Sequence, residues 1–132
     1  GPDLAHGKPW RASSAHLGYL ATGSGQQLSD VGVFFHTVEE AGPWVEVDLG
    51  ADAPLSEVTL VNRADGVPAL AARAAPLVVE VRSGDSSAWN EVARVEDVFD
   101  TWSARFPELS ARVVRVRALR TTFLHLERVE LR

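Results

Sequence analysis

The segment FFHTVEEAGPWVEVDLG places a histidine and two glutamates immediately before a regular strand pattern. His36 could contact a ligand through its imidazole, and its neighbours Phe34 or Phe35 could offer a flat surface to the C–H face of a sugar. Glu39 and Glu40 form a carboxylate pair in the same loop. Loop carboxylates of this kind mostly face water, so we expect Glu39 and Glu40 at most to accept a hydrogen bond from a ligand hydroxyl.

A second group of polar residues follows a later strand pattern. Arg63 and Asp65 in VNRADG are two residues apart, so their side chains point to the same side of an extended chain, where the carboxylate can hold the guanidinium. Arg73 adds a second guanidinium. Two Arg residues together with His36 suit a ligand rich in oxygen acceptors, either sugar hydroxyls or a small anion.

The chain lacks the enzyme motifs that such residues could serve. ATGSG, at Ala21–Gly25, lacks the first glycine of the nucleophile elbow and follows no predicted strand, so we interpret it as a flexible loop. The four histidines form no i, i+4 pair of the zinc-protease type, and no phosphate-binding G-x-x-x-x-G-K-[ST] loop is present. Glu46 and Asp48 alternate with apolar residues, which indicates a solvated strand face. We therefore predict a protein that is not an enzyme.

Strands must position these residues. Only Pro68–Pro76 and Asp97–Ser103 could form a helical turn. Near Glu127 the apolar residues change from even to odd positions, which indicates a bulge. Half-polar alternation is typical of antiparallel sheets with one buried face, so we predict an all-β sandwich. The segments that alternate in this way are WVEVDL, SEVTLVN, PLVVEVRS, AWNEVARV, ARVVRVRAL and FLHLERVELR.

The order of the strands predicts where the polar groups meet. If the strands beginning at Trp44 and Leu55 are successive and antiparallel, the loop before the first and the loop after the second lie at the same end of the sandwich. His36 and the segment Arg63–Arg73 would then share that end.

Length and composition narrow the class of protein further. A chain of 132 residues can bury a core as one domain, residues 1–132, and no apolar run approaches the roughly 18 residues of a membrane helix. The formal net charge of -5 argues against nucleic acid and makes a membrane surface an unsuitable partner. The absence of cysteine excludes disulfides and thiolate metal sites. The opening Gly1–Pro2 is typical of a protease scar, so a targeting signal could have been removed.

Six blocks of the sequence, taken in order, resemble a known family. They are LAHGKPWRASSAH, PWVEVDLG, LSEVTLVNR, PLVVEVRSGDSSAWNEVAR, ARVVRVRAL and FLHLERVEL, and they look like a discoidin domain, also called the coagulation factor C-type domain. The resemblance implies a jelly-roll β-sandwich of the galactose-binding-like superfamily. Members bind carbohydrate, phospholipid head groups, collagen or other proteins, and the resemblance favours an extracellular or cell-surface location.

Within that superfamily the sequence is most similar to the fucose-binding lectins, the fucolectins. These carry a histidine ahead of a Pro-Trp strand, then an Arg-x-Asp and a second basic residue, which match His36, Arg63, Asp65 and Arg73. The resemblance implies that the histidine and the two basic residues bind sugar hydroxyls, while the aspartate holds the first arginine. Arg73 lies further from Asp65 than the family pattern has it, and GVPALAA replaces a frequent cysteine pair, so the identity of the sugar stays open.

The resemblance also implies a structural calcium ion. In fucolectins an Asp-rich loop before the histidine and a glutamate near the C-terminus hold the ion, and Asp30 and Glu127 match these positions. The loop ATGSGQQLSDVG has one carboxylate, so backbone carbonyls would have to supply much of the set of about 6 to 8 oxygen ligands that calcium prefers. No other cofactor is expected.

These observations predict a noncatalytic carbohydrate-binding module, tethered to other domains of a larger protein, that binds a small sugar such as fucose or galactose. The predicted contacts are His36, Arg63, Arg73, Phe35 and Glu39. One alternative is a structural or protein–protein interaction module in which the same residues only brace the loops. Another is binding of phospholipid head groups, which is disfavoured because the loop aromatics lie beside acidic residues.

Overall fold

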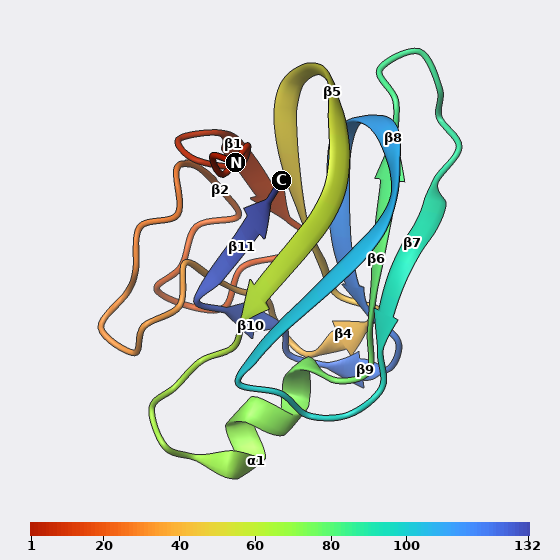
Figure 1. Ribbon diagram of the computed structural model, residues 1–132. Helices are drawn as coiled ribbons and strands as arrows, with labels where there is room; N and C mark the ends of the chain where they lie inside the picture. Colours follow the sequence, from red (N-terminus) through yellow and green to blue (C-terminus); the bar gives the residue numbers. More distant parts are fainter.

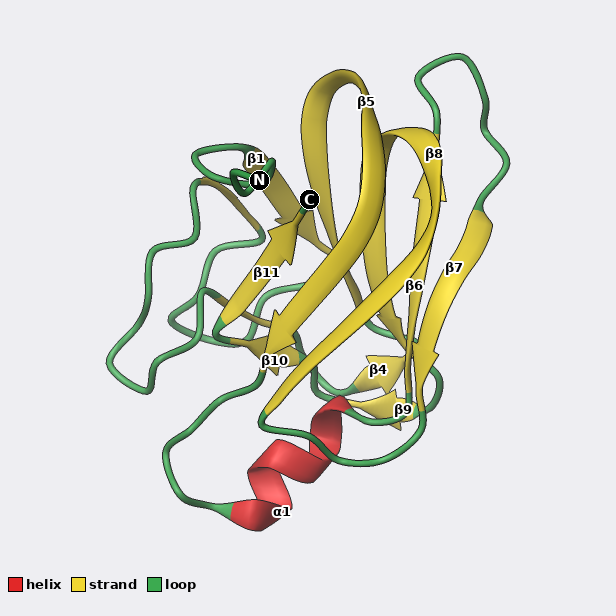
Figure 2. Ribbon diagram, viewed as in Figure 1, coloured by secondary structure: helices red, strands yellow, loops and turns green.

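The computed structural model describes residues 1–132 as two layers of antiparallel strands (Figure 1). Helix is confined to one short segment at the lower end of the molecule (Figure 2). None of the helical segments is long and apolar enough to cross a membrane. The elements are β1 (Pro9–Ala12), β2 (Thr22–Ser24), β3 (Phe35–His36), β4 (Glu40–Ala41), β5 (Trp44–Val61), α1 (Pro68–Ala71), η1 (Ala72–Ala74), β6 (Leu77–Arg82), β7 (Asn90–Val95), β8 (Thr101–Ala118), β9 (Thr121–Thr122), β10 (His125–Leu126) and β11 (Arg128–Leu131).

Two long strands, β5 and β8, run through both layers. The first half of β5 pairs with β1 and with the second half of β8, whereas its second half pairs with β11 and with the first half of β8. The register shifts between Asp48 and Ala53, where Gly50 takes a φ of 86° that L side chains rarely adopt. Both strands curl over at the upper end in Figure 1, so both ends of β5 lie at the lower end. The segments predicted as two strands are one bent strand, and the predicted meeting of the two loops follows from that bend.

The larger sheet has the strand order β2-β1-β5-β8-β6-β7, with β11 added to β5. The inward positions of the long strands carry the apolar residues that the alternation predicted, including Val45, Val47, Val114 and Val116, all of which are buried. Two small sheets, β3-β10 and β4-β9, complete the lower end. The antiparallel β-sandwich is confirmed, and its short strands hold the loops that carry the candidate site.

Two local predictions need correction. The stretch Asp97–Ser103 forms no helical turn, because its last three residues begin β8, whereas Pro68–Pro76 does contain the predicted turn as α1 and η1. The loop predicted at ATGSG contains strand β2. Gly23 allows that strand to lie directly on the indole of Trp10, since a Cβ there would be only 2.6 Å from the ring.

The bulge predicted near Glu127 needs correction, because the chain there passes between two strands. Leu126 ends β10, which pairs with β3, and Arg128 begins β11, which pairs with β5. Glu127 between them donates its backbone N–H to the carbonyl of Val61, at 2.8 Å. The change of parity thus marks the point where the chain passes from one sheet to another.

Candidate functional site

The end of β5 fixes the first arginine of the candidate site. Asn62, 1% exposed, donates its side-chain N–H groups to the carbonyls of Ala71 and Phe99, at 2.9 and 3.1 Å, and accepts the backbone N–H of Arg63 at 2.8 Å. This bracing sets the direction in which Arg63 leaves the strand. The α1–η1 turn is held to the same asparagine, so the segment carrying the second arginine is fixed by the same residue.

Arg63 and Asp65 form the ion pair that their spacing predicted. Nε of Arg63 donates to Oδ1 at 3.1 Å, and Nη2 donates to Oδ2 at 2.5 Å. The Arg63 side chain is only 6% exposed, so it is not an ordinary surface arginine. The hydrogen bond from Arg63 lowers the pKa of Asp65, which keeps the carboxylate charged. Nη1 makes no hydrogen bond within the protein, so it is left to donate to a ligand.

His36 lies on β3, directly opposite His125 of β10. Its Nδ1 is 2.8 Å from the carbonyl of Thr37, and a carbonyl can only accept, so Nδ1 carries the hydrogen and Nε2 is the free acceptor. Burial lowers the pKa of His36 and outweighs this hydrogen bond, and the charges of Arg63 and Arg73 act in the same direction as burial. The imidazole is therefore neutral at neutral pH and can accept a hydrogen bond from a hydroxyl.

Arg73 reaches the same end of the sandwich from η1. Its guanidinium carbon lies 4.5 Å from the centroid of the Phe123 ring, and the Phe123 ring is 5.8 Å from the ring of His36. The hydroxyl of Thr122 donates to the backbone carbonyl of Arg73 at 3.1 Å. A cation over an aromatic face is attracted by the ring, and this contact places the second set of N–H donors beside His36.

Aromatic rings surround His36, and no sequence pattern indicated them. The ring of His16 is 4.8 Å from that of His36, and the ring of Tyr19 is 5.1 Å from it. The backbone N–H of His16 donates to the carbonyl of His36 at 2.7 Å, so this loop is bound to β3. We call His16, Tyr19, His36, Arg63, Asp65, Arg73 and Phe123 the rim site. Neither His16 nor Phe123 stands at a spacing that would relate it to His36: the pairing of β3 with β10 brings Phe123 close, and the hydrogen bond to the carbonyl of His36 brings His16 close.

A buried histidine lies behind the rim site. His125 has no exposed surface, and neither of its ring nitrogens has a hydrogen-bond partner. Burial, followed by the charges of Arg63, His36 and Arg73, lowers its pKa to about 3. The ring of His125 is 4.9 Å from that of His36, so a neutral and unsatisfied imidazole packs against the neutral imidazole of His36.

Two of the predicted contacts lie elsewhere. Phe35 has no exposed surface and packs on Phe34 and Trp10 in the core, with ring centroids 4.8 and 6.4 Å away, so it cannot stack on a sugar. Phe123, which is half-buried, is the phenylalanine that lies beside His36. Glu39 is exposed and makes no hydrogen bond, whereas Glu40 accepts hydrogen bonds from the hydroxyls of two neighbouring serines.

The calcium ligands that the resemblance implies, Asp30 and Glu127, stay a prediction. Asp30 is exposed and Glu127 is half-buried, and no three His, Cys, Asp or Glu side chains converge, so backbone carbonyls would have to supply most of the oxygens that calcium prefers. Gln26 ties the loop before Asp30 to the C-terminal strand, because its side chain donates to the carbonyl of Val129 at 2.9 Å and accepts its N–H at 2.8 Å. This pair of hydrogen bonds joins the loop to β11.

Comparison with known proteins identifies the family. The model of the NedA-like galactose-binding domain, an F5/F8 type C family, matches residues 29–116, which is more than half of the chain. The chain belongs to this family, and the resemblance to coagulation factor C-type domains is confirmed. The curated proteins include no match to the chain.

Solved structures with the same fold include several lectin modules. The lectin domain of lectinolysin, in complex with Lewis B antigen, is 28% identical with a TM-score of 0.77, and the match covers 99% of this chain and 96% of that one. A fucose-binding module of Streptococcus pneumoniae is 26% identical with a TM-score of 0.75, over 98% of this chain and 94% of that one. A fucolectin from striped bass serum, Morone saxatilis, shares the fold at 22% identity and a TM-score of 0.77, over 98% of this chain and 47% of that one.

Proposed function

We propose that this domain is a noncatalytic carbohydrate-binding module whose rim site binds one small sugar of the fucose or galactose type. The observation that carries the proposal is the state of Arg63. Arg63 is almost fully buried, its guanidinium is hydrogen-bonded to the carboxylate of Asp65, and the neutral imidazole of His36 lies beside it. A guanidinium held in one orientation loses little freedom when its remaining N–H groups bind a ligand, so this arrangement suits recognition of sugar oxygens.

The groups at the rim site divide between hydrogen bonding and apolar contact. Nη1 of Arg63 and the guanidinium of Arg73 are donors to sugar oxygens, and Nε2 of His36 accepts a hydroxyl hydrogen. The ring of Phe123, together with those of His16 and Tyr19, offers apolar surface to a C–H face or a methyl group. No group in this set is placed to act as nucleophile or general acid, which supports binding without catalysis.

The comparisons support the sugar class. Two structures above 25% identity, which span nearly the whole chain, are described as a complex with Lewis B antigen and as a fucose-binding module. A site that contacts a single sugar buries few atoms, so its dissociation constant should be on the order of 0.1 to 1 mM. Useful avidity would then come from tethering to other domains or from clustering.

One observation favours a second candidate, binding of a phospholipid head group. The loop that carries His16 also carries Leu17 and Leu20, which are 92% and 76% exposed. Exposed leucines beside an arginine-rich site could enter a membrane surface while the head group occupies the rim site. The aromatic residues Phe34, Phe35 and Trp10 have no part in this, because all three are buried.

A titration separates these candidates. L-fucose, D-galactose, D-glucose and D-mannose are added to the protein in a calorimeter, with and without a chelator, and vesicles with 30% phosphatidylserine are tested by sedimentation. We expect saturable binding of L-fucose or D-galactose that is unchanged by the chelator. The variant His36→Phe should abolish it, while Arg105→Ala, on a side chain that is 86% exposed, should leave it unchanged. Binding to vesicles with no response to any of the four sugars would favour the lipid candidate.

A further inference from the structure

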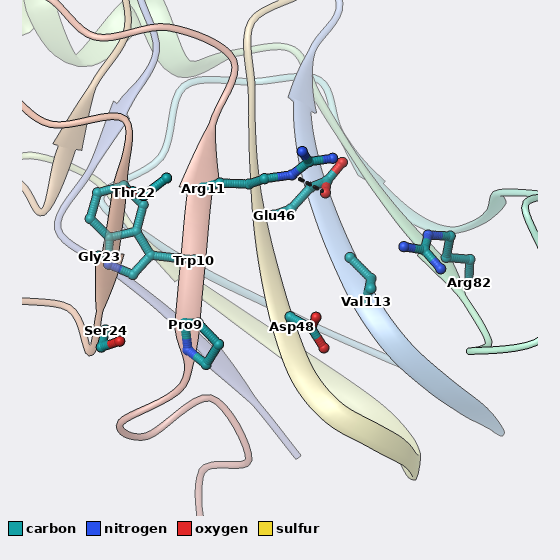
Figure 3. A pocket seen from close by; sticks show the side chains of 10 residues that line it. All are labelled: Pro9, Trp10, Arg11, Thr22, Gly23, Ser24, Glu46, Asp48, Arg82 and Val113. Carbon is teal, nitrogen blue, oxygen red and sulfur yellow. Dashed lines mark hydrogen bonds and ion pairs between the residues drawn. The ribbon is translucent and has the colours of Figure 1, made fainter.

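A cavity lies away from the rim site, on the outer face of the larger sheet (Figure 3). It is an open groove of about 550 Å³ that crosses β1, β5 and β8 between edge strand β2 and the end of β6. Its volume falls within the range of about 300 to 1,000 Å³ that is usual for small-molecule sites. We call it the outer groove.

Charged side chains in the outer groove are fixed by neighbours but keep free hydrogen-bonding atoms. Nε of Arg11 donates to Oε1 of Glu46 at 3.0 Å, and the Glu46 side chain is only 8% exposed. Oδ1 of Asp48 accepts from Arg112 at 3.3 Å and from the N–H of Gly50 at 2.8 Å. In both carboxylates the second oxygen, Oε2 or Oδ2, has no hydrogen bond within the protein. Two anchored acceptors thus face the outer groove, one of them on a side chain that is more than nine-tenths buried.

Donors stand opposite these acceptors. Arg82, on the far side of the outer groove in Figure 3, pairs with no carboxylate, and its guanidinium carbon lies 5.5 Å from the centroid of the half-buried Trp89. The β2 wall is rigid, because the indole N–H of Trp10 donates to the carbonyl of Gly25 at 2.8 Å and Gly23 lies against the indole ring. The outer groove therefore has fixed walls and carries both donors and acceptors before any ligand arrives.

We propose that the outer groove is a second carbohydrate site, which takes a neutral linear oligosaccharide. Arg11 and Arg82 balance Glu46 and Asp48, so the outer groove favours neither an anion nor a cation. Only two of its ten lining residues are hydrophobic, which does not suit the apolar centre of a protein interface. Hydroxyls, which both donate and accept, match paired carboxylate and guanidinium groups, and the open ends leave room for a chain to continue. The site shares no residue with the rim site, so it does not depend on the proposed function.

The test is an NMR titration of the whole protein with four neutral hexasaccharides, made of β-1,4-glucose, β-1,4-mannose, β-1,4-xylose and α-1,4-glucose. We expect at least one to give saturable shifts at the indole N–H of Trp10 and at the amides of Gly23 and Val113. The His36→Phe variant should bind it unchanged, while Glu46→Gln and Arg82→Gln should each weaken it at least tenfold. Arg105→Ala serves as the matched control.

Three results would overturn the proposal. The first is no shift at the outer groove with any of the four hexasaccharides. The second is a shift that disappears in His36→Phe, which would place the ligand at the rim site. The third is unchanged affinity in both groove variants while their spectra show a folded protein. A failure of monosaccharide binding at the rim site would leave these outcomes unaffected, so the two proposals fail separately.

Discussion

The rim site and the outer face of the larger sheet both gather arginines and acids, but they satisfy them in different ways. On the sheet face, cross-strand pairing places Arg11, Glu46, Arg115 and Glu80 in one row over four adjacent strands, so each charge has an opposite charge beside it. At the rim site the residues come from separate loops and short strands, and His125 behind them has no hydrogen-bond partner at all. Regular strands give each charge an opposite charge as a neighbour, even where one carboxylate oxygen stays free, whereas the site built from loops leaves a buried ring with no partner, at a cost in stability.

The largest expected effect is on binding at the rim site. Replacing Arg63 with Met keeps the buried stem but removes the charged donors, so the free energy of sugar binding should become less favourable by about 2 kcal/mol or more, about 30-fold in affinity. Calorimetry with the sugar that binds the unchanged protein measures the loss. Circular dichroism checks the fold, and full affinity in a folded Arg63→Met protein would contradict sugar binding at the rim site.

On the sheet face a comparable change should act on stability instead. Glu80 accepts from Arg117 at 2.9 and 3.2 Å and from Arg115 at 3.2 Å, and its side chain is 11% exposed. The variant Glu80→Gln removes the negative charge and one of the two acceptor oxygens that the arginines share and puts an NH2 donor beside them, so the free energy of unfolding should fall by about 1 to 3 kcal/mol. Urea denaturation measures it, and sugar affinity should not change. Unchanged stability would mean that the charge row contributes nothing.

Lowering the pH should lower the free energy of unfolding, mainly through His125 behind the rim site. The unfolded chain protonates His125 near pH 6.5, whereas the folded chain protonates it only near pH 3, so the unfolded state binds more protons between these values and stability falls as the pH falls. From pH 7 to pH 5 this one residue should lower the free energy of unfolding by about 2 kcal/mol. The lowered pKa of His36 acts in the same direction. Urea denaturation at pH 7, 6 and 5 tests this, and a flat profile would contradict the buried neutral imidazole.

A smaller gain in stability is expected from replacing His125, whose ring nitrogens have no hydrogen-bond partner. The variant His125→Phe keeps an aromatic ring in the site but needs no hydrogen bonds, so the free energy of unfolding at pH 7 should rise by about 1 kcal/mol and its pH dependence should decrease. His6→Phe, at an exposed histidine, is the matched control for the pH dependence. A loss of stability in His125→Phe would show that His125 has a partner, such as a buried water.

The smallest expected effect is at Glu39. This side chain is exposed and has no hydrogen bond, so Glu39→Ala should change neither sugar affinity nor the free energy of unfolding beyond about 0.5 kcal/mol. Calorimetry and urea denaturation on the same sample measure both. A clear loss of affinity would restore Glu39 to the site that the sequence analysis gave it.

The parts of the fold that repeat with a period of two were predictable. Alternation identified the strands and their buried faces, and the i, i+2 spacing of Arg63 and Asp65 identified the ion pair. The first half of β8 was missed even though Trp102, Ala104 and Phe106 alternate there, because Pro107 and several polar residues interrupt the pattern. Strand β2 is too short to show a period at all.

The rim site was only partly predictable because its members meet through tertiary pairing. His36, Arg63 and Arg73 could be placed together from the order of strands and from the family resemblance. His16 and Phe123 could not, since residues more than 80 positions apart are joined only when β3 pairs with β10. Phe35 was misplaced because the segment before Trp44 was interpreted as an exposed loop, whereas both Phe34 and Phe35 are buried in the core.

The central claim is that the neutral imidazole of His36, beside the fixed Arg63, contacts the sugar. It is tested most directly by NMR of the imidazole nitrogens during a titration with L-fucose and then with D-galactose. We expect Nδ1 of His36 to be protonated and Nε2 to be unprotonated. One of the sugars should shift the Nε2 resonance saturably, while the nitrogen resonances of His6 stay unchanged. A protonated Nε2, or a sugar response at His6 with none at His36, would contradict it.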